Sequence, residues 1–265
     1  MVCRRILSHL LIGLSACIPL QSPAESLHIA VASNFKHTHQ ALVNAFYQSL
    51  SESEAPDIKI QTSSGSSGTL FAQIKNGAPF DVYLSADAAR PDRLITLGLA
   101  SQKSRRVYAQ GQIVLWQPGA TKAVSIHSLI DTLNNKSARY VLANPDLAPY
   151  GAAAKVLMER HGAWKPRDPS RITAHNIATA FQYLASGTVP IGWVAMSQLR
   201  SWQQQHPVNS QSYWLADVND YPKIQQVAVT LNRSDNKALA TKFMSFMAAP
   251  DALSLIRSHG YLLPE

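Results

Sequence analysis

The strongest constraint on the fold of this chain is a repeated alternation of short apolar runs with stretches of helical periodicity. Apolar runs bounded by turn residues indicate buried strands, and apolar residues spaced three and four apart indicate helices that cover them. This order predicts an α/β fold with a largely parallel sheet. In the first block we expect strands at 27–32, 58–62 and 82–84 and helices at 38–50, 66–76 and 88–97.

The alternation is interrupted and then resumes, which predicts two lobes. Extended segments at 107–109 and 112–116 have little helical pattern between them. We therefore expect a ligand cleft between a first lobe, residues 25–109 plus 221–265, and a second lobe, residues 110–220. In the second block we expect strands at 140–143, 171–173 and 191–194 and helices at 150–160 and 177–185, and in the tail a strand at 226–231 and helices at 236–248 and 250–260.

The first 24 residues have the composition of an export signal. Arg4 and Arg5 precede a mostly apolar stretch, 6–20, that is shorter than the roughly 20 residues a membrane-spanning helix needs. Small residues end the segment at Ala24, which predicts cleavage there and a periplasmic mature chain. Cys17, in Leu-Ser-Ala-Cys, is also typical of a lipoprotein signal. We favour soluble release over lipidation at Cys17, and either of them over a buried N-terminal helix.

Composition narrows the class of protein further. About 46% of the residues are hydrophobic and 15% are charged, which excludes a disordered chain. Both cysteines, Cys3 and Cys17, lie in the leader, so the mature chain would have neither a disulfide nor thiol chemistry. Two of the 24 Lys and Arg also lie there, so against 16 Asp and Glu the net charge falls from +8 to +6. A positive charge of this size is compatible with nucleic acid, an anionic membrane, an anionic ligand or solubility alone. Because the basic residues are scattered, we expect no nucleic acid.

Small and polar residues gather where expected strands pass into expected helices. In open α/β sheets ligands bind beyond the carboxyl ends of the strands, and helix N-termini favour anions. Each of these residues could also be a simple helix cap. Gly65 and Gly68 favour a ligand site at the second turn, because they let the backbone close tightly on an anion. The four turns are Ser33-Asn34, Ser63-Ser-Gly-Ser-Ser-Gly-Thr69, Asn144-Pro-Asp-Leu-Ala-Pro-Tyr150-Gly151 and His175-Asn176-Ile177.

Common catalytic motifs are missing from the sequence. It contains no Gly-x-Ser-x-Gly and no His-Glu-x-x-His, and no Gly-Lys-Ser/Thr follows the Ser/Gly run. His37 and His39 form a lone pair, while Asp81 and Asp87 have the positions of a strand start and a helix cap. We therefore expect a binding protein with no catalytic residue, no cofactor and no cation site, and we rank an envelope enzyme well below it.

Five stretches together carry a family resemblance: Ala-Val-Ala-Ser33-Asn34-Phe, Ser-Ser-Gly-Ser-Ser67-Gly-Thr-Leu, Gly77-Ala-Pro-Phe-Asp-Val-Tyr-Leu-Ser-Ala-Asp87, Asn144-Pro…Ala-Pro-Tyr150-Gly and Gly260-Tyr-Leu-Leu. Over essentially the whole mature chain the sequence resembles the molybdate/tungstate-binding proteins of bacterial ABC transporters, which have the type II periplasmic binding protein fold. The resemblance implies that uncharged donors from both lobes hold a molybdate or tungstate oxyanion. The implied ligand residues are Ser33, Asn34 and Ser67, with backbone donors at Tyr150 and Ile177.

One position departs from the family pattern. Many members have a ligand-facing tyrosine where this chain has Ala195, and the side chain of Asn34 would replace that donor. The resemblance also implies a membrane permease as partner, a monomeric state and a hinge near Tyr108 and Asp220. Ala195 keeps a second hypothesis open, in which the same fold binds sulfate, phosphate or a small organic anion.

Overall fold

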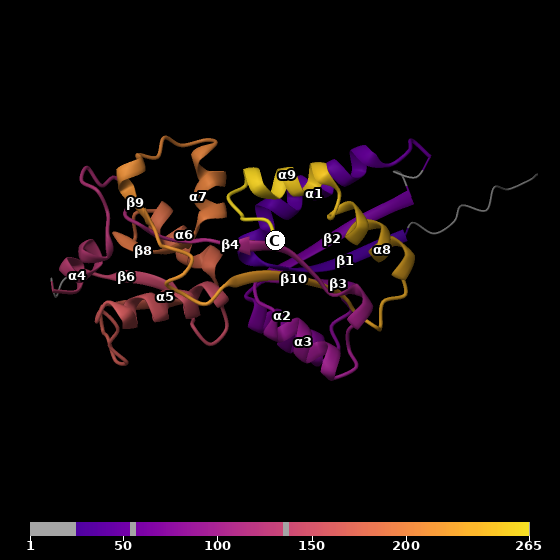
Figure 1. Cartoon of the computed structure of the whole chain (residues 1–265), viewed down its shortest axis with the longest axis horizontal. Coiled ribbons are helices and arrows are strands. Elements are labelled where there is room, and N and C mark those ends of the chain that lie inside the picture. Colours follow the sequence, from indigo (N-terminus) through magenta and orange to yellow (C-terminus); the bar gives the residue numbers. More distant parts are fainter. Residues whose placement is uncertain (1–24, 54–56, 135–137, 265) are drawn as a thin grey trace, which may run out of the picture.

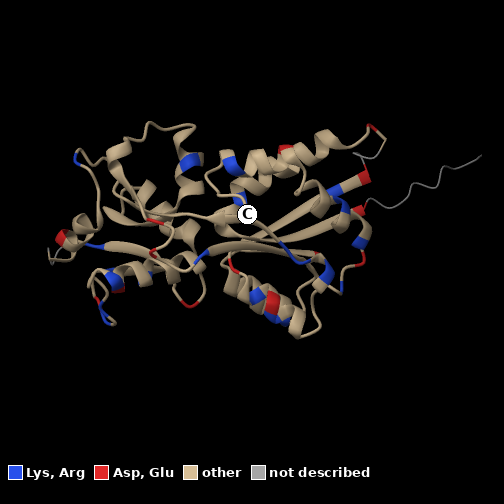
Figure 2. Cartoon of the chain, viewed as in Figure 1, with Lys and Arg blue, Asp and Glu red and all other residues tan. Residues whose placement is uncertain are grey.

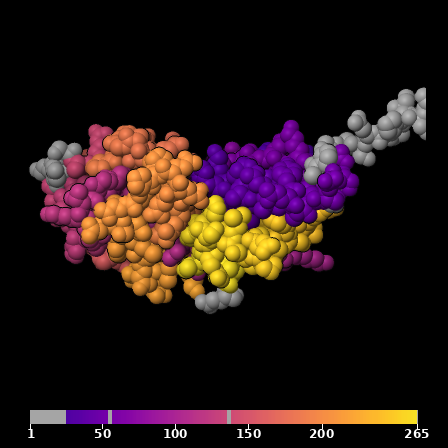
Figure 3. Space-filling model, turned by 90° about the horizontal axis from the view of Figure 1, so that it is seen from above, coloured from indigo at the N-terminus to yellow at the C-terminus, as the bar shows by residue number. Residues whose placement is uncertain are grey.

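The computed structural model describes residues 25–53, 57–134 and 138–264, so cleavage after Ala24 and lipidation of Cys17 concern residues outside the described part. The chain forms two lobes that lie side by side (Figure 1, Figure 3). Each lobe is built on its own five-stranded sheet with helices around it. The predicted two-lobed α/β fold is therefore confirmed.

The first sheet has the strand order β2-β1-β3-β10-β4. The strands β1, β2 and β3 are parallel, as predicted for the first block, whereas β10 runs antiparallel to both of its neighbours, so the sheet is mixed with one reversed strand. The strands are β1 (Glu25–Ala32), β2 (Ile58–Gly65), β3 (Val82–Ser85), β4 (Arg106–Gly111) and β10 (Ile224–Thr230).

Helices cover both faces of this sheet (Figure 1). Because side chains alternate along a strand, Leu27, Ile29 and Val31 of β1 pack into a core with α1, α8 and α9, while Ala30 packs on the opposite face with α2 and α3. The helices are α1 (Lys36–Ser49), α2 (Ser67–Lys75), α3 (Ala89–Thr96), α8 (Lys237–Phe246) and α9 (Pro250–Ser258), and short 3₁₀ turns form η1 (Ser33–Phe35) and η3 (Gln102–Ser104).

The second sheet has the order β7-β6-β8-β5-β9 and is also mixed, because β5 is antiparallel to both β8 and β9. The core around this sheet is a single apolar cluster that includes the fully buried Trp193. Its elements are β5 (Ile113–Trp116), β6 (Tyr140–Ala143), β7 (Arg171–Ala174), β8 (Ile191–Ala195), β9 (Tyr213–Leu215), α4 (Ile126–Asn134), α5 (Pro149–Arg160), α6 (Ile177–Ala185), α7 (Met196–Gln203) and η4 (Ser210–Ser212).

The connection between the lobes is short on one side. The strand β4 ends at Gly111 in the first sheet and β5 begins at Ile113 in the second, so one residue, Gln112, separates the two sheets. The chain returns between β9 and β10. Two covalent crossings of this kind permit one lobe to rotate against the other.

Most predicted elements are confirmed to within a few residues, and three were missed. The helices α4 and α7 and the strand β9 occur where the sequence pattern predicted no element. The helix α7 begins at the residue after the end of β8, so no turn in the sequence marks where the strand stops and the helix starts. Lys and Arg are dispersed over both lobes among Asp and Glu (Figure 2). Within the described ranges, no helix has the length and apolar character to cross a membrane.

Candidate functional site

The carboxyl ends of three strands of the first lobe face the beginnings of two helices of the second lobe. Between them lies a small pocket of about 10 Å³, which we call the cleft pocket. Every predicted site residue borders it, so the structure brings together positions up to 144 residues apart, from Ser33 to Ile177. The lining residues are Ala32, Ser33, Asn34, Gly65, Ser66, Ser67, Ala86, Ala148, Pro149, Tyr150 and Ile177, none of which has a side chain that is charged at neutral pH.

The hydroxyl of Ser67, at the first position of α2, can donate a hydrogen bond to a ligand. Its Oγ accepts a hydrogen bond from the backbone N–H of Ala86 at 3.0 Å, which leaves the hydroxyl proton without an acceptor in the described ranges. The N-cap residue Ser66 accepts from Thr69 N, and the Gly68 N–H is used by Leu147 O at 2.9 Å. The N–H of Ser67 therefore stays available at a helix terminus, where backbone donors favour anions.

Ser33 contributes the matching group from the first turn. It begins η1, which continues directly into α1, and it is 6% exposed. No hydrogen bond joins its hydroxyl to any described part of the chain. The Ser33 oxygen is not one of the fully buried side-chain atoms that lack a partner, so it keeps some contact with solvent. A ligand in the cleft pocket would supply the missing partner.

The first donor of α5 belongs to Tyr150. Pro149 occupies the first helical position, where its missing N–H costs nothing because that N–H would have no acceptor inside the helix. The next N–H, that of Tyr150, likewise has no acceptor inside the helix. The sequence Ala-Pro-Tyr-Gly thus presents the N–H of Tyr150 as the leading donor of the helix.

The start of α6 likewise leaves one backbone donor unused, the N–H of Ile177. Asn176 is its N-cap, and the Asn176 Oδ1 accepts from Ala178 N at 2.9 Å and from Thr179 N at 3.0 Å. Ile177 is the first helical residue and its N–H is not used by the cap. Gln198 holds this turn in place by donating from Nε2 to the Ile177 carbonyl at 3.1 Å.

Asn34 lies in a buried polar cluster that joins the lobes. Its side-chain NH₂ is 2.8 Å from Gln226 Oε1, 3.0 Å from the Tyr261 hydroxyl and 3.4 Å from the Tyr150 hydroxyl. The Asn34 carbonyl accepts from Ser197 Oγ and from the Tyr261 hydroxyl. The side-chain NH₂ predicted to face the ligand is thus engaged on the protein side, and the donor that Asn34 has left to offer an anion is its backbone N–H.

The phenol of Tyr150 reaches back across the interface towards Gly111. A Cβ at Gly111 would lie 2.1 Å from the Tyr150 hydroxyl oxygen, so only glycine fits at this strand end. Burial raises the pKa of Tyr150 well above its ordinary value, and nearby tyrosines, Tyr261 first, raise it further. The phenol is therefore neutral at physiological pH, and no other pocket-lining side chain titrates there.

Sequence reasoning missed Gln226, Tyr261, Ser197 and Gly111, which support the site without being at a strand-to-helix turn. Gln226 carried a detectable signal, because it is a polar residue within the apolar run of β10, and it is fully buried. Tyr261 lies in the Gly260-Tyr-Leu-Leu stretch that carries the family resemblance, but nothing there marked it as part of the site, and Ser197 and Gly111 carried no local signal. Ala195 is fully buried at the N-cap of α7 and does not border the cleft pocket, so the departure at this position does not widen the pocket.

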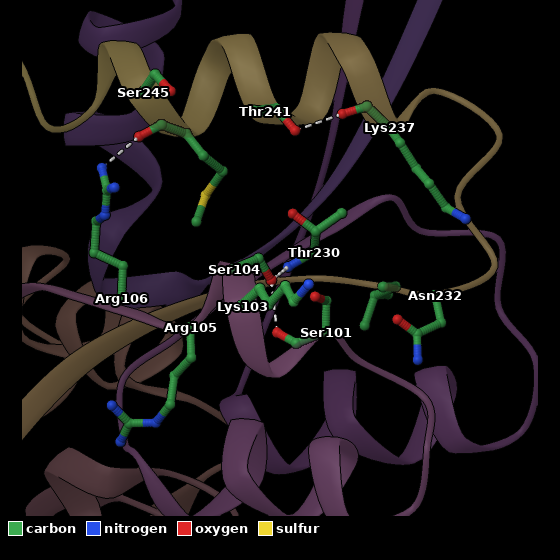
Figure 4. A pocket seen from close by; sticks show the side chains of 12 residues that line it. Ser101, Lys103, Ser104, Arg105, Arg106, Thr230, Asn232, Lys237, Thr241 and Ser245 are labelled. Carbon is green, nitrogen blue, oxygen red and sulfur yellow. Dashed lines mark hydrogen bonds between the residues drawn. The ribbon is translucent and has the colours of Figure 1, made fainter.

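A larger and far more basic hollow, which we call the outer pocket, lies at the other end of the first lobe (Figure 4). Its volume is about 450 Å³, but its cations do not converge. Arg105 pairs with Asp92 at 2.5 Å, Arg106 donates to the Met244 carbonyl, and Arg105 and Lys237 point to opposite sides (Figure 4). Its lining residues are Ser101, Lys103, Ser104, Arg105, Arg106, Thr230, Leu231, Asn232, Lys237, Thr241, Met244 and Ser245.

The two histidines of the pair lie in different surroundings. His39 is buried and its Nε2 lies 3.0 Å from Thr62 Oγ1, whereas His37 is exposed. Burial lowers the pKa of His39 to about 4, so the ring is neutral at physiological pH. Across residues 25–53, 57–134 and 138–264 there is no group of three or more His, Cys, Asp or Glu arranged to hold a metal ion.

A two-lobed α/β fold with helix-start donors facing each other across a small pocket defines a solute-binding protein. In agreement with this, the chain belongs to the family of bacterial extracellular solute-binding proteins, whose pattern it matches over residues 27–262. This is a family of binding proteins and not of enzymes.

Known relatives cover nearly the whole chain. The molybdate-binding protein ModA of Rhodobacter capsulatus is 31% identical over 245 residues, which is 92% of this chain and 91% of the relative. ModA of Azotobacter vinelandii is 30% identical over 250 residues, 94% of this chain and 93% of the relative. The solved structure of the Azotobacter vinelandii periplasmic molybdate-binding protein superposes with a TM-score of 0.80 at 31% identity, covering 90% of this chain and all of that one.

Proposed function

We propose that this protein binds a tetrahedral oxyanion, molybdate or tungstate, and delivers it to the membrane permease of an ABC importer. The observation that carries the proposal is the set of unused neutral donors around the cleft pocket. Two relatives about 30% identical over nearly the whole chain are named molybdate-binding proteins, which supports the same ligand here.

The donor set suits a small dianion. It comprises the hydroxyls of Ser33 and Ser67 and the backbone N–H groups of Asn34, Ser67, Tyr150 and Ile177. Hydrogen bonds to a charged acceptor contribute about 1.5–3 kcal/mol each, so about six of them can offset the loss of hydration of a buried dianion. Donors from helix starts in both lobes can reach the oxygens of a tetrahedral anion from several directions.

The absence of charge on the lining residues favours a fully ionised anion. Four of the six groups are backbone N–H groups, which cannot accept a proton from the ligand, so a protonated oxyanion would lose a hydrogen bond where its O–H meets one of them. A pocket this small favours a single compact anion over an extended organic one. Sulfate and phosphate remain the competing ligands.

Closure about the two crossings would bring the donors together. We propose that the first lobe comprises residues 25–109 plus 221–265 and the second residues 110–220, with the hinge near Tyr108 and Asp220. Gly111 and Gln112, at the shorter crossing, lie directly next to this hinge. Rotation there would separate Ser33 and Ser67 from Tyr150 and Ile177 and release the ligand.

We further propose that residues 1–24 direct export to the periplasm and that the mature protein acts there as a monomer. A permease would recognise the closed, loaded form. The mass of the N-terminus of the exported protein distinguishes cleavage after Ala24 from lipidation at Cys17.

A melting-temperature screen tests the ligand. The mature chain is heated with molybdate, tungstate, sulfate or phosphate, and an anion that binds only the folded state raises the melting temperature by mass action. We expect molybdate and tungstate to raise it and sulfate and phosphate to do so only weakly. A response to sulfate or phosphate alone would move the assignment to the competing ligand, and no response to any of the four would refute oxyanion binding.

A further inference from the structure

An arginine outside the cleft pocket ties the two lobes together. Arg90, in the first turn of α3, donates from Nη2 to the Asp146 carbonyl of the second lobe at 2.8 Å. The neighbouring carbonyl, that of Leu147, accepts from Gly68 N at 2.9 Å. Two consecutive carbonyls of the segment before α5 are therefore held by the starts of α2 and α3.

Contacts within the first lobe hold Arg90 in the position from which it reaches the second lobe. Its Nη1 pairs with Asp87 Oδ2 at 2.5 Å, and its backbone N–H donates to Asp87 Oδ1 at 2.8 Å. A planar guanidinium held on one edge loses little freedom when its other edge forms a hydrogen bond. Because Asp87 balances its charge, Arg90 adds little net attraction for an approaching anion.

The contact is close-packed around Gly68. A Cβ at Gly68 would lie 3.0 Å from the Leu147 Cα and oxygen and 3.1 Å from Arg90 Nη2. The segment that Arg90 and Gly68 hold runs on through Ala148 and Pro149 to Tyr150, whose N–H is a proposed ligand donor. Neither Arg90 nor Asp146 borders the cleft pocket.

We propose that Arg90 is a positioning residue that latches the lobes shut and so slows ligand release. This inference rests on the proposed function. The latch exists only when the lobes are together, so it stabilises the closed state relative to the open one. It acts after the ligand has entered, and it therefore changes the dissociation rate and leaves the association rate nearly unaltered.

The kinetic test compares Arg90→Ala with Arg93→Ala, which removes the same charge from an exposed position on the same helix. Stopped-flow measurements with molybdate should show dissociation about 10-fold faster or more for Arg90→Ala, since a charge-assisted hydrogen bond is lost. Association should change less than about 2-fold, and Arg93→Ala should change neither rate by more than that. Arg90→Lys, with a single donor group, should fall in between. Equal effects of Arg90→Ala and Arg93→Ala, or an effect on association alone, would overturn the latch.

A second measurement separates the latch from the identity of the ligand. Spin labels at Lys75→Cys in the first lobe and Arg167→Cys in the second report the distance between the lobes in the mature chain, which has no other cysteine. Arg90→Ala and Gly68→Ala should each shift the distribution to longer distances, with or without molybdate. If the wild type binds no oxyanion and this shift still occurs, the ligand assignment fails and the latch stands. An unchanged distribution in Arg90→Ala would refute the latch.

Discussion

The cleft pocket and the outer pocket lie at opposite ends of the same sheet. They differ in the charge of their lining residues and in how their hydrogen-bond donors are arranged. The outer pocket holds Lys103, Arg105, Arg106 and Lys237, whereas no residue of the cleft pocket is charged at neutral pH. The outer pocket is also far larger, at about 450 against about 10 Å³. By net charge alone, the outer pocket would be the better place for an anion.

The arrangement of donors favours the cleft pocket as the place where an anion binds. In the outer pocket the arginines are engaged by Asp92 and by the Met244 carbonyl, and Lys237 points away from Arg105 (Figure 4). In the cleft pocket the caps of α2 and α6 and the Leu147 carbonyl take up neighbouring first-turn donors, and α5 begins with a proline, which has no N–H. The N–H groups of Ser67, Tyr150 and Ile177 are left for the site. Fixed neutral donors need no counter-charge and do not have to be desolvated as ions, so they hold a buried anion at lower cost than a lysine would.

The largest expected effect comes from removing both hydroxyls of the cleft pocket. Ser33→Ala and Ser67→Ala should each weaken oxyanion binding by about 1–3 kcal/mol, because a donor to a charged acceptor is lost. Titration calorimetry of the single and double variants measures this. Ser101→Ala and Ser245→Ala make the same change in the outer pocket and should leave affinity unaltered. Weakening of equal size in both pairs would erase the distinction between the pockets.

Acidification should lower the stability of the fold more than the affinity of the cleft pocket for an anion. Burial lowers the pKa of His39 to about 4, against about 6.5 in the unfolded chain. The unfolded state therefore binds the proton more readily, so stability is fully present above about pH 6.5 and is lost progressively as the pH falls towards 4, by up to about 3 kcal/mol.

Denaturant unfolding at several pH values measures this loss. His39→Gln should flatten the pH dependence of stability between pH 4 and 6.5. Affinity should stay constant between pH 6 and 8, because no group that lines the cleft pocket titrates in that range. A His39→Gln variant with the wild-type slope would assign the acid sensitivity to other groups.

A larger side chain at Gly111, next to the short connection between the lobes, should disturb the cleft pocket through Tyr150. Gly111→Ala places a methyl group against the Tyr150 hydroxyl, and such clashes typically cost about 1–3 kcal/mol of stability. Tyr150→Phe removes the clashing oxygen and keeps the backbone N–H. The double variant should therefore recover part of the stability and affinity that Gly111→Ala loses, which thermal unfolding and calorimetry can compare. No recovery would mean that Gly111 acts through something other than Tyr150.

The smallest effect is expected from the outer pocket itself. Lys103→Ala with Lys237→Ala removes two exposed charges and should change oxyanion affinity less than about 2-fold, since surface charges are screened at physiological salt. The association rate should fall slightly at low salt and return to that of the wild type as salt is added. A large loss of affinity in stopped-flow or calorimetric measurements would show that the basic pocket takes part in binding.

Local sequence determined most of the helices and strands and the turns where donors could lie. Caps, glycine stops and apolar spacing act over about four residues, so α6 and β6 occur where expected and the four strand-to-helix turns could be located. Within those turns, the family resemblance singled out Ser33, Ser67, Tyr150 and Ile177. The direction of the antiparallel strands and the helix α7 could not be predicted in this way. An apolar run does not reveal its direction in a sheet, and α7 has no break separating it from β8.

Tertiary structure alone decided which donors are free and what holds the lobes. The NH₂ group of Asn34 is taken by Gln226, which is 192 residues away in the chain, and by Tyr261, which is 227 residues away. Arg90 meets Asp146 across 56 residues. Contacts at such separations depend on how two whole sheets pack, and no local pattern encodes that. The sequence therefore specified which groups could bind an anion, and the packing of the lobes decided which of them remain available to do so.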